Sequence, residues 1–146
     1  MYNSITKWLI FSTLFLISCD EKPFQEETKE FGTFLNTNFK QTLPIGKTVF
    51  LLFPSSICKN CFLLDGRDYD TAFLEKLNII SSVDSTNFHH FDNIYLDKND
   101  KTIRLSFVHY QCQIVIVDKG KIVNIIPLNN YEKQLDSLQK VFTKLY

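Results

Sequence analysis

Residues 48–61, TVFLLFPSSICKNC, contain the pattern that decides the fold expected for this chain. Residues 49–53 are a short, uninterrupted apolar run, and Pro54 with two serines closes it, which is typical of a fully buried strand. Cys58 and Cys61 follow with CxxC spacing. A CxxC that opens a helix holds one thiol at the helix N-terminus, where the partial positive charge stabilises a thiolate. The stretch therefore predicts a reactive cysteine pair.

Composition favours one globular domain. The chain has 146 residues, 45% of them hydrophobic and 14 of them Phe, which is enough to fill a single core. The formal net charge is zero, with acids and bases interspersed, so we expect no nucleic-acid partner. No Gly-rich phosphate loop, Ser-His-Asp set or paired-carboxylate spacing stands out, which gives other enzyme classes little support.

The N-terminus has the features of an export signal. Lys7 precedes an apolar segment of about ten residues, 8–17, which suits a signal peptide and is short for a membrane span. It ends in Leu-Ile-Ser-Cys19, which resembles the bacterial lipobox. We therefore expect residues 1–18 to be removed and Cys19 to carry lipid, including palmitate, on its sulfur and amine. The alternative is a plain secretory signal or a short membrane anchor with an incidental cysteine.

The mature chain is expected to begin with a tether. Residues 20–30, DEKPFQEETKE, are highly charged, which is typical of a solvated segment; a sorting address is the alternative function for this acidic run. We assign residues 19–36 to the lipidated Cys19 and the tether, and residues 37–146 to the folded domain. Apolar residues at helical spacing begin at Phe31.

The segment after the CxxC contains further periodic patterns. Their spacing predicts, in order, a helix over 70–80 with Phe73, Leu74, Leu77 and Ile80 on one face, a strand over 93–97, a helix over 102–110, strands over 113–117 and 121–126, and a helix from residue 130 onward. Asp118-Lys119-Gly120 predicts a hairpin turn between the last two strands. This order of elements indicates a layered α/β domain.

At this point the chain resembles the thioredoxin fold, in particular the membrane-anchored, exported thiol–disulfide oxidoreductases. The resemblance covers about residues 40–146 and is carried by VFLLF followed by PSSICKNC, by NIYLD, and by the hairpin IVIVDKGKIVNII before a terminal helix. It implies a mixed central sheet flanked by helices.

The resemblance also implies roles for the CxxC residues. Cys58 would be the exposed nucleophile that attacks a partner disulfide, and Cys61 the resolving thiol that releases the mixed disulfide. Lys59 and Asn60 would set the redox potential, and the Lys59 charge would favour the Cys58 thiolate. The alternative for Lys59 is an ordinary solvated lysine.

The implied setting is the bacterial cell envelope. Partners would be exported proteins or small-molecule thiols and disulfides, with attachment to a membrane through the lipid anchor. No cofactor is implied. Three positions depart from the family pattern: Leu52 stands where many members bury an acidic proton acceptor, Ile57 stands where many carry Trp before the first cysteine, and Cys112 stands at a position where the family usually has a proline.

Cys112 is the unpaired cysteine of the domain. It lies six residues before Asp118, where the resemblance places a cis-proline facing the CxxC. Three interpretations stay open: a small buried apolar residue, a third redox thiol, or a ligand for Cu(I) or Zn²⁺ together with Cys58, Cys61 and His109. Besides the oxidoreductase, two function classes follow: this metal-binding module, and a non-catalytic binding lipoprotein in which the CxxC is a structural disulfide.

Overall fold

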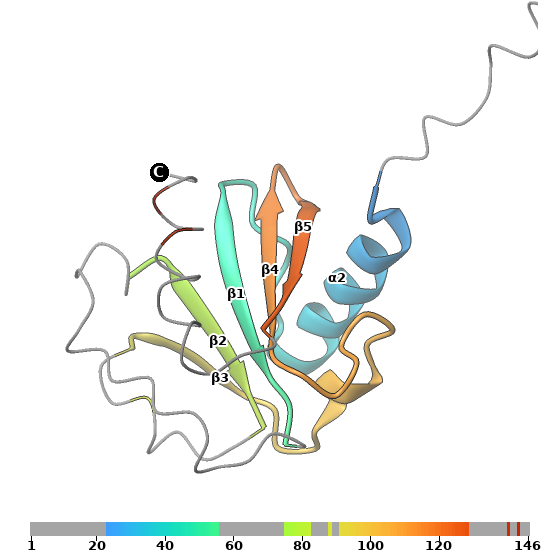
Figure 1. Ribbon diagram of the computed structural model, residues 1–146, viewed down its shortest axis with the longest axis vertical. Coiled ribbons are helices and arrows are strands. Elements are labelled where there is room, and N and C mark those ends of the chain that lie inside the picture. Colours follow the sequence, from blue (N-terminus) through green and yellow to red (C-terminus); the bar gives the residue numbers. More distant parts are fainter. Residues whose placement is uncertain are drawn as a thin grey trace, which may run out of the picture.

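The computed structural model describes residues 23–55, 75–82, 88, 91–128, 140 and 143. Within them lie α2 (Gln25–Phe39), β1 (Thr48–Phe53), β2 (Leu77–Ser81), β3 (Asn93–Leu96), the 3-10 helix η3 (Lys101–Arg104), β4 (Gln113–Asp118) and β5 (Lys121–Pro127). The five strands form one mixed sheet in the order β3-β2-β1-β4-β5. The predicted α/β class is confirmed (Figure 1).

Strand β1 is the centre of this sheet, as its unbroken apolar sequence predicts. It pairs in parallel with β2 and antiparallel with β4. Val49, Leu51 and Phe53 belong to the apolar cluster on one face, and Phe50 and Leu52 to the cluster on the other. Because a strand buried on both faces has no solvent side, a continuous apolar run replaces the usual alternation. Each such side chain contributes roughly 1.5–3 kcal/mol by leaving water.

Helix α2 covers the face that carries Phe50. Phe31 is fully buried, and its ring lies edge-on to Phe50 with centroids 5.2 Å apart and to Phe107 with centroids 6.2 Å apart. The backbone N–H of Ile122 in β5 donates to the Thr28 hydroxyl at 3.0 Å. The helix is therefore joined to the sheet both by aromatic packing and by a polar contact near its N-terminus.

The expected tether over 19–36 differs from the structure, because α2 begins at Gln25. Glu26 and Lys29 are exposed, while Phe31, Phe34 and Leu35 are buried at i, i+3 and i+4, as in an amphipathic helix. Glu30 accepts hydrogen bonds from the N–H and the hydroxyl of Ser106, at 3.0 and 2.6 Å. The high density of charged residues predicts a solvated segment, but the apolar residues at helical spacing within it pack against the sheet.

The helix predicted over 70–80 is wrong at its C-terminal end, where β2 begins at Leu77. Residues 70–74 lie outside the described part. Leu77 and Ile80 have helical spacing, but Leu77, Ile79 and Ile80 are all fully buried, and they belong to clusters on both faces of the sheet. A short apolar run fits both a helix face and a doubly buried strand, and pairing with β1 decides between them.

The helix predicted over 102–110 is also wrong, apart from its first residues. Only η3 is helical here, and Leu105 is already extended. The buried carboxylate of Asp97 accepts hydrogen bonds from the N–H and the hydroxyl of Thr102, both at 2.6 Å, which holds the chain in a tight turn. The backbone of Tyr110 has a φ of 55°, a conformation that no helix contains.

The strand predicted over 93–97 is confirmed as β3, and the predicted hairpin is confirmed as β4 and β5. Lys119 and Gly120 at its tip have φ values of 51° and 72°, as a type I′ turn requires. Their N–H groups donate to the carbonyl oxygens of Ile45 and Pro44, which ties the tip to the segment before β1. Of the helix predicted after residue 130, only Lys140 and Thr143 are described, both helical.

Candidate functional site at the end of strand β1

The predicted site residues fall on both sides of the described boundary. Those outside the described residues are Cys19, Cys58, Lys59, Asn60 and Cys61. Cys112 and His109 lie inside. The described residues nearest in sequence to the CxxC are the end of β1, Pro54 and Ser55, which mark the end of the sheet closest to it along the chain.

Cys112 lies beside the end of β1. The last register pair between β1 and β4 joins Leu52 to Gln113, and Cys112 directly precedes Gln113. Cys112 and Phe53 belong to the same apolar cluster. The N–H of Leu128 donates to the Cys112 carbonyl oxygen at 2.9 Å, which fixes this backbone next to the end of β5. Cys112 is thus held at the sheet edge where β1 ends.

The Cys112 side chain has an apolar environment. It is 2% exposed and forms no disulfide. Burial raises the pKa of its thiol far above the ordinary value, so the thiol stays protonated at neutral pH. Because the thiolate is both the nucleophile and the metal ligand, this environment favours the interpretation of Cys112 as a small core residue.

His109 has a different environment, since its side chain is exposed. In the described ranges, His, Cys, Asp and Glu side chains form no group of three or more that is suited to hold a metal ion. The two described members of the alternative metal set therefore differ sharply in solvation, one buried in apolar surroundings and the other in water.

The end of β1 is held by a carboxylate to which the sequence analysis assigned no role. Asp100 accepts the backbone N–H of Ser55 at 3.1 Å on one oxygen and the Ser55 hydroxyl on the other. Partial burial raises the pKa of the Asp100 carboxyl, but hydrogen bonds, chiefly from Ser55, outweigh this effect and leave its pKa below the ordinary value. The carboxylate is therefore ionised at neutral pH.

The turn after β3 presents Asp100 to Ser55. The N–H of Asp97 donates to the Ser81 carbonyl oxygen at 2.8 Å, and the N–H of Asp100 donates to the Asp97 carbonyl oxygen at 3.0 Å. Asp100 itself has a left-handed backbone with a φ of 49°, which Asp tolerates better than most residues. One signal was available: acids that follow a strand lie at the edge where the carboxyl ends of parallel strands meet.

Gln113 is a buried polar residue beside this site. Its side chain is 2% exposed, and its Oε1 has no hydrogen-bond partner in the described part of the chain. An unpaired buried acceptor lowers the stability of the folded state by roughly 1–3 kcal/mol, and this one lies next to Cys112 in the sequence. Sequence reasoning placed Gln113 in the strand but assigned it no role.

Searches of the whole chain against protein-family models, curated proteins and solved structures found no match. Among the described residues, no helix has both the length and the apolar character needed to cross a membrane.

Proposed function

We propose that the protein is an exported, lipid-anchored thiol–disulfide oxidoreductase of thioredoxin-like architecture. Cys58 is the nucleophile and Cys61 the resolving thiol, with lipid on Cys19. The observation that supports this proposal best is the position of β1. β1 is the central strand and is buried on both faces. Two residues after it, the N–H of Ser55 donates to Asp100, and Cys58 follows Ser55 by three residues.

Covalent geometry limits how far the first cysteine is from this anchor. Three residues span at most about 11 Å, so the Cα of Cys58 stays within that distance of the Ser55 Cα. The anchor at Ser55 is itself fixed by two hydrogen bonds to one carboxylate. A nucleophile needs a defined approach to its target, and a short connection to a rigid strand provides one.

The sheet topology supports the finer thioredoxin-like assignment. β1 has a parallel neighbour that follows it in sequence and an antiparallel neighbour that begins a hairpin. The resemblance implies a mixed central sheet, and this pairing of the strand that precedes the CxxC is consistent with it. Cys112 immediately precedes the antiparallel neighbour and belongs to the same apolar cluster as Phe53 at the end of β1.

The proposed chemistry is an exchange of two disulfide bonds. The Cys58 thiolate attacks one sulfur of a partner disulfide, the partner S–S bond breaks, and the second partner sulfur leaves as a thiolate. The Cys61 thiolate then attacks Cys58 in the mixed disulfide, which forms the Cys58–Cys61 bond and releases the partner as a dithiol. Two electrons pass to the partner, and an external dithiol returns them. The reverse sequence of the same steps oxidises a partner.

We assign the exchange to Cys58 and Cys61 alone. A role for Cys112 as third redox thiol or as metal ligand requires loss of its proton in an apolar site, which burial opposes. The side chain of His109 is exposed and the thiol of Cys112 is buried, so the two do not lie in a common polar site. The described residues therefore favour the exchange over the metal-binding alternative.

The reduction potential of the full chain in detergent tests the proposal. A reversible couple between about −270 and −120 mV, lost in Cys58→Ser, is the expected result for a catalyst of thiol exchange. A potential below about −300 mV would instead identify a structural disulfide and overturn the catalytic proposal. Copper or zinc bound in stoichiometric amount, and lost in Cys112→Ala, would favour the metal-binding alternative.

A further inference from the structure

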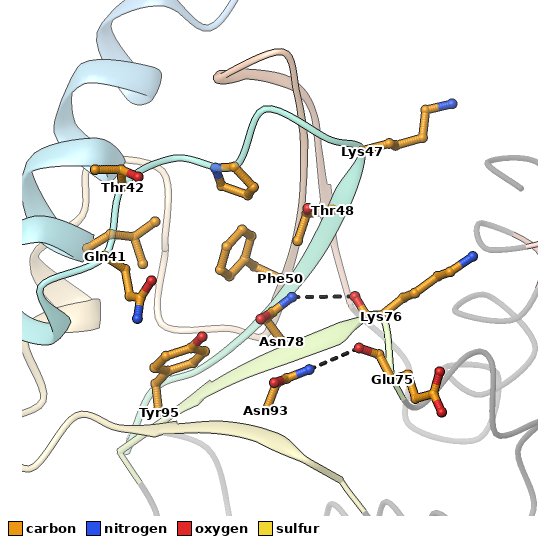
Figure 2. A pocket seen from close by; sticks show the side chains of 12 residues that line it. Gln41, Thr42, Lys47, Thr48, Phe50, Glu75, Lys76, Asn78, Asn93 and Tyr95 are labelled. Atoms are coloured by element: carbon orange, nitrogen blue, oxygen red, sulfur yellow. Dashed lines mark hydrogen bonds between the residues drawn. The ribbon is translucent and has the colours of Figure 1, made fainter.

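A pocket of about 390 Å³ lies at the opposite end of the sheet from Ser55 and Cys112. It opens where β1, β2 and β3 begin and where the chain returns from α2 toward β1 (Figure 2). This volume falls within the range of about 300–1,000 Å³ that is typical of small-molecule sites. The proposed thiol chemistry does not use this end of the sheet.

Three residues of the pocket lining form one row across the sheet, and two of them are asparagines. Phe50, Asn78 and Asn93 are register partners on β1, β2 and β3. The next row toward the carboxyl ends on the same face is Leu52, Ile80 and Tyr95. Two adjacent asparagines are unusual on a sheet face that otherwise packs apolar side chains, because Asn is depleted in strands. Asn78 is the half-buried position in an otherwise buried β2.

Backbone carbonyl groups orient both asparagines. The Nδ2 of Asn93 donates to the Glu75 carbonyl oxygen at 2.9 Å, and the Nδ2 of Asn78 donates to the Lys76 carbonyl oxygen at 3.4 Å. With the amide nitrogens held in this way, the carboxamide oxygens are the acceptors that these side chains present to a ligand. Figure 2 shows Asn78, Phe50 and Tyr95 gathered around the middle of the pocket.

Charged groups lie at the rim of the pocket. Figure 2 shows the ammonium ends of Lys47 and Lys76 and the carboxylate of Glu75 extending away from its middle. The rest of the lining consists of aliphatic side chains, aromatic rings, amides and hydroxyl groups; Leu35 and Pro44 supply the aliphatic surface, and Tyr95 and Thr48 supply hydroxyls. An ionised ligand would lose hydration there without gaining an opposite charge, so the lining suits an uncharged molecule.

We propose that this pocket binds an uncharged, hydroxylated ring of monosaccharide size. Its hydroxyl groups donate to the Asn78 and Asn93 carboxamide oxygens, and the Tyr95 hydroxyl contributes a further hydrogen bond. The ring of Tyr95, which is only partly buried, packs against a C–H face of the ligand. The ligand is either a free sugar or a sugar unit within a glycan, since both present the same hydroxylated ring.

The test is a titration of the full chain, followed by proton–nitrogen correlation spectra of the side-chain amides, in a detergent without a sugar headgroup. D-Glucose and N-acetylglucosamine are the neutral probes, and glucose 6-phosphate is the charged comparison. We expect saturable shifts at Asn78 and Asn93 with the neutral probes only. Methyl glucoside distinguishes the sources: binding as tight as that of glucose points to a unit within a glycan, and clearly weaker binding points to a free sugar.

Three variants locate the binding. Asn78→Ala and Tyr95→Phe should each raise the Kd about 2- to 12-fold, as expected for the loss of one hydrogen bond. Asn124→Ala, on the exposed side of β5, is the matched control and should leave the Kd unchanged. Tyr95→Phe keeps the ring that contacts Phe39, with centroids 5.4 Å apart, so folding is preserved.

The proposal is overturned by any of three results. The first is the absence of saturable shifts with either neutral sugar up to about 100 mM. The second is a Kd that does not change in Asn78→Ala or in Tyr95→Phe. The third is tighter binding of glucose 6-phosphate than of glucose, which would identify an anion site. None of these results bears on the proposed thiol chemistry, so the two proposals fail independently.

Discussion

Asp100 and Ser55, 45 residues apart in sequence, join the turn after β3 to the end of β1 through two hydrogen bonds to one carboxylate. The link spans β2, which lies between these strands in the sheet. It therefore fastens three parallel strands at their carboxyl ends. Ser55, at this end of the sheet, is the last described residue before the CxxC.

Replacing Asp100 with Asn should lower the free energy of unfolding by about 0.5–1.5 kcal/mol. The amide keeps the shape and tolerates the left-handed backbone, but it removes a charge-assisted acceptor at a partly solvated site. Urea unfolding of the full chain in detergent measures the change. Asp92→Asn, at an exposed position, is the control and should be within about 0.5 kcal/mol of wild type. Equal effects in both variants would show that the link to Ser55 contributes nothing.

The same link predicts a dependence of stability on pH. The folded-state pKa of Asp100 lies below its ordinary value of 3.8, so the unfolded chain binds this proton more readily. The contribution is complete above pH 3.8 and is lost as the pH falls through the folded-state pKa. The stability difference between wild type and Asp100→Asn should therefore be constant from neutral pH down to about 5 and should shrink below 4. A difference that does not change with pH would contradict the ionised carboxylate.

Cys58 and Cys61 should respond differently to substitution. Cys58→Ser should abolish the reduction of a model protein disulfide, because the attacking thiolate is lost. Cys61→Ser should accumulate mixed disulfides that are visible on non-reducing gels, because nothing releases the partner. Cys112→Ala is the control and should keep most of the activity, since its buried thiol stays protonated. Full activity in both CxxC variants would place the chemistry elsewhere.

Gln113→Met should leave the stability unchanged or raise it by up to about 1 kcal/mol. Methionine has a similar length and carries no amide, so it removes a buried acceptor that has no described partner. Chemical unfolding measures the effect, and Gln25→Met at an exposed position corrects for a general effect of methionine. A loss of more than about 1 kcal/mol would show that the Gln113 amide is paired in solution.

Phe31→Ala should destabilise the fold by about 3–5 kcal/mol, because it removes a fully buried ring that contacts Phe34, Phe50 and Phe107. Thr33→Ala, on the exposed side of the same helix, is the matched control. Thermal unfolding compares the two. Similar melting temperatures of the two variants would contradict this packing and would favour the interpretation of residues 25–36 as a tether.

Strong local signals allowed β1 and the β4–β5 hairpin to be predicted. An apolar run closed by Pro54 and a turn that contains Gly120 each specify a structure within a few residues. β2 was predicted incorrectly because its apolar residues fit two periods and only pairing with β1 selects one. The charged start of α2 was predicted incorrectly because its packing depends on Phe50 and Phe107, which are distant in sequence.

The residues of the candidate site also differ in whether a local sequence pattern or a contact between distant residues determines their role. The CxxC spacing is a local pattern, so the sequence alone suffices to propose Cys58 and Cys61, which lie outside the described residues. The role of Asp100 depends on a contact with a residue 45 positions away, and its place after a strand indicates only the end of the sheet at which it lies, not its partner. The burial of Cys112 is likewise a property of the assembled sheet, since only the register with β1 brings it beside Phe53.

The start of α2 at Gln25 has a consequence for how the protein would meet its partners. With lipid on Cys19, as proposed, only six residue steps separate the anchor from the helix, a reach of about 20 Å at full extension. That is less than the length of α2, which is about 22 Å for 15 residues. The domain would then stay against the bilayer, and encounters would be confined to a thin layer above it. Proteins and small thiols that pass through this layer, rather than those in the bulk compartment, would set the rate of exchange.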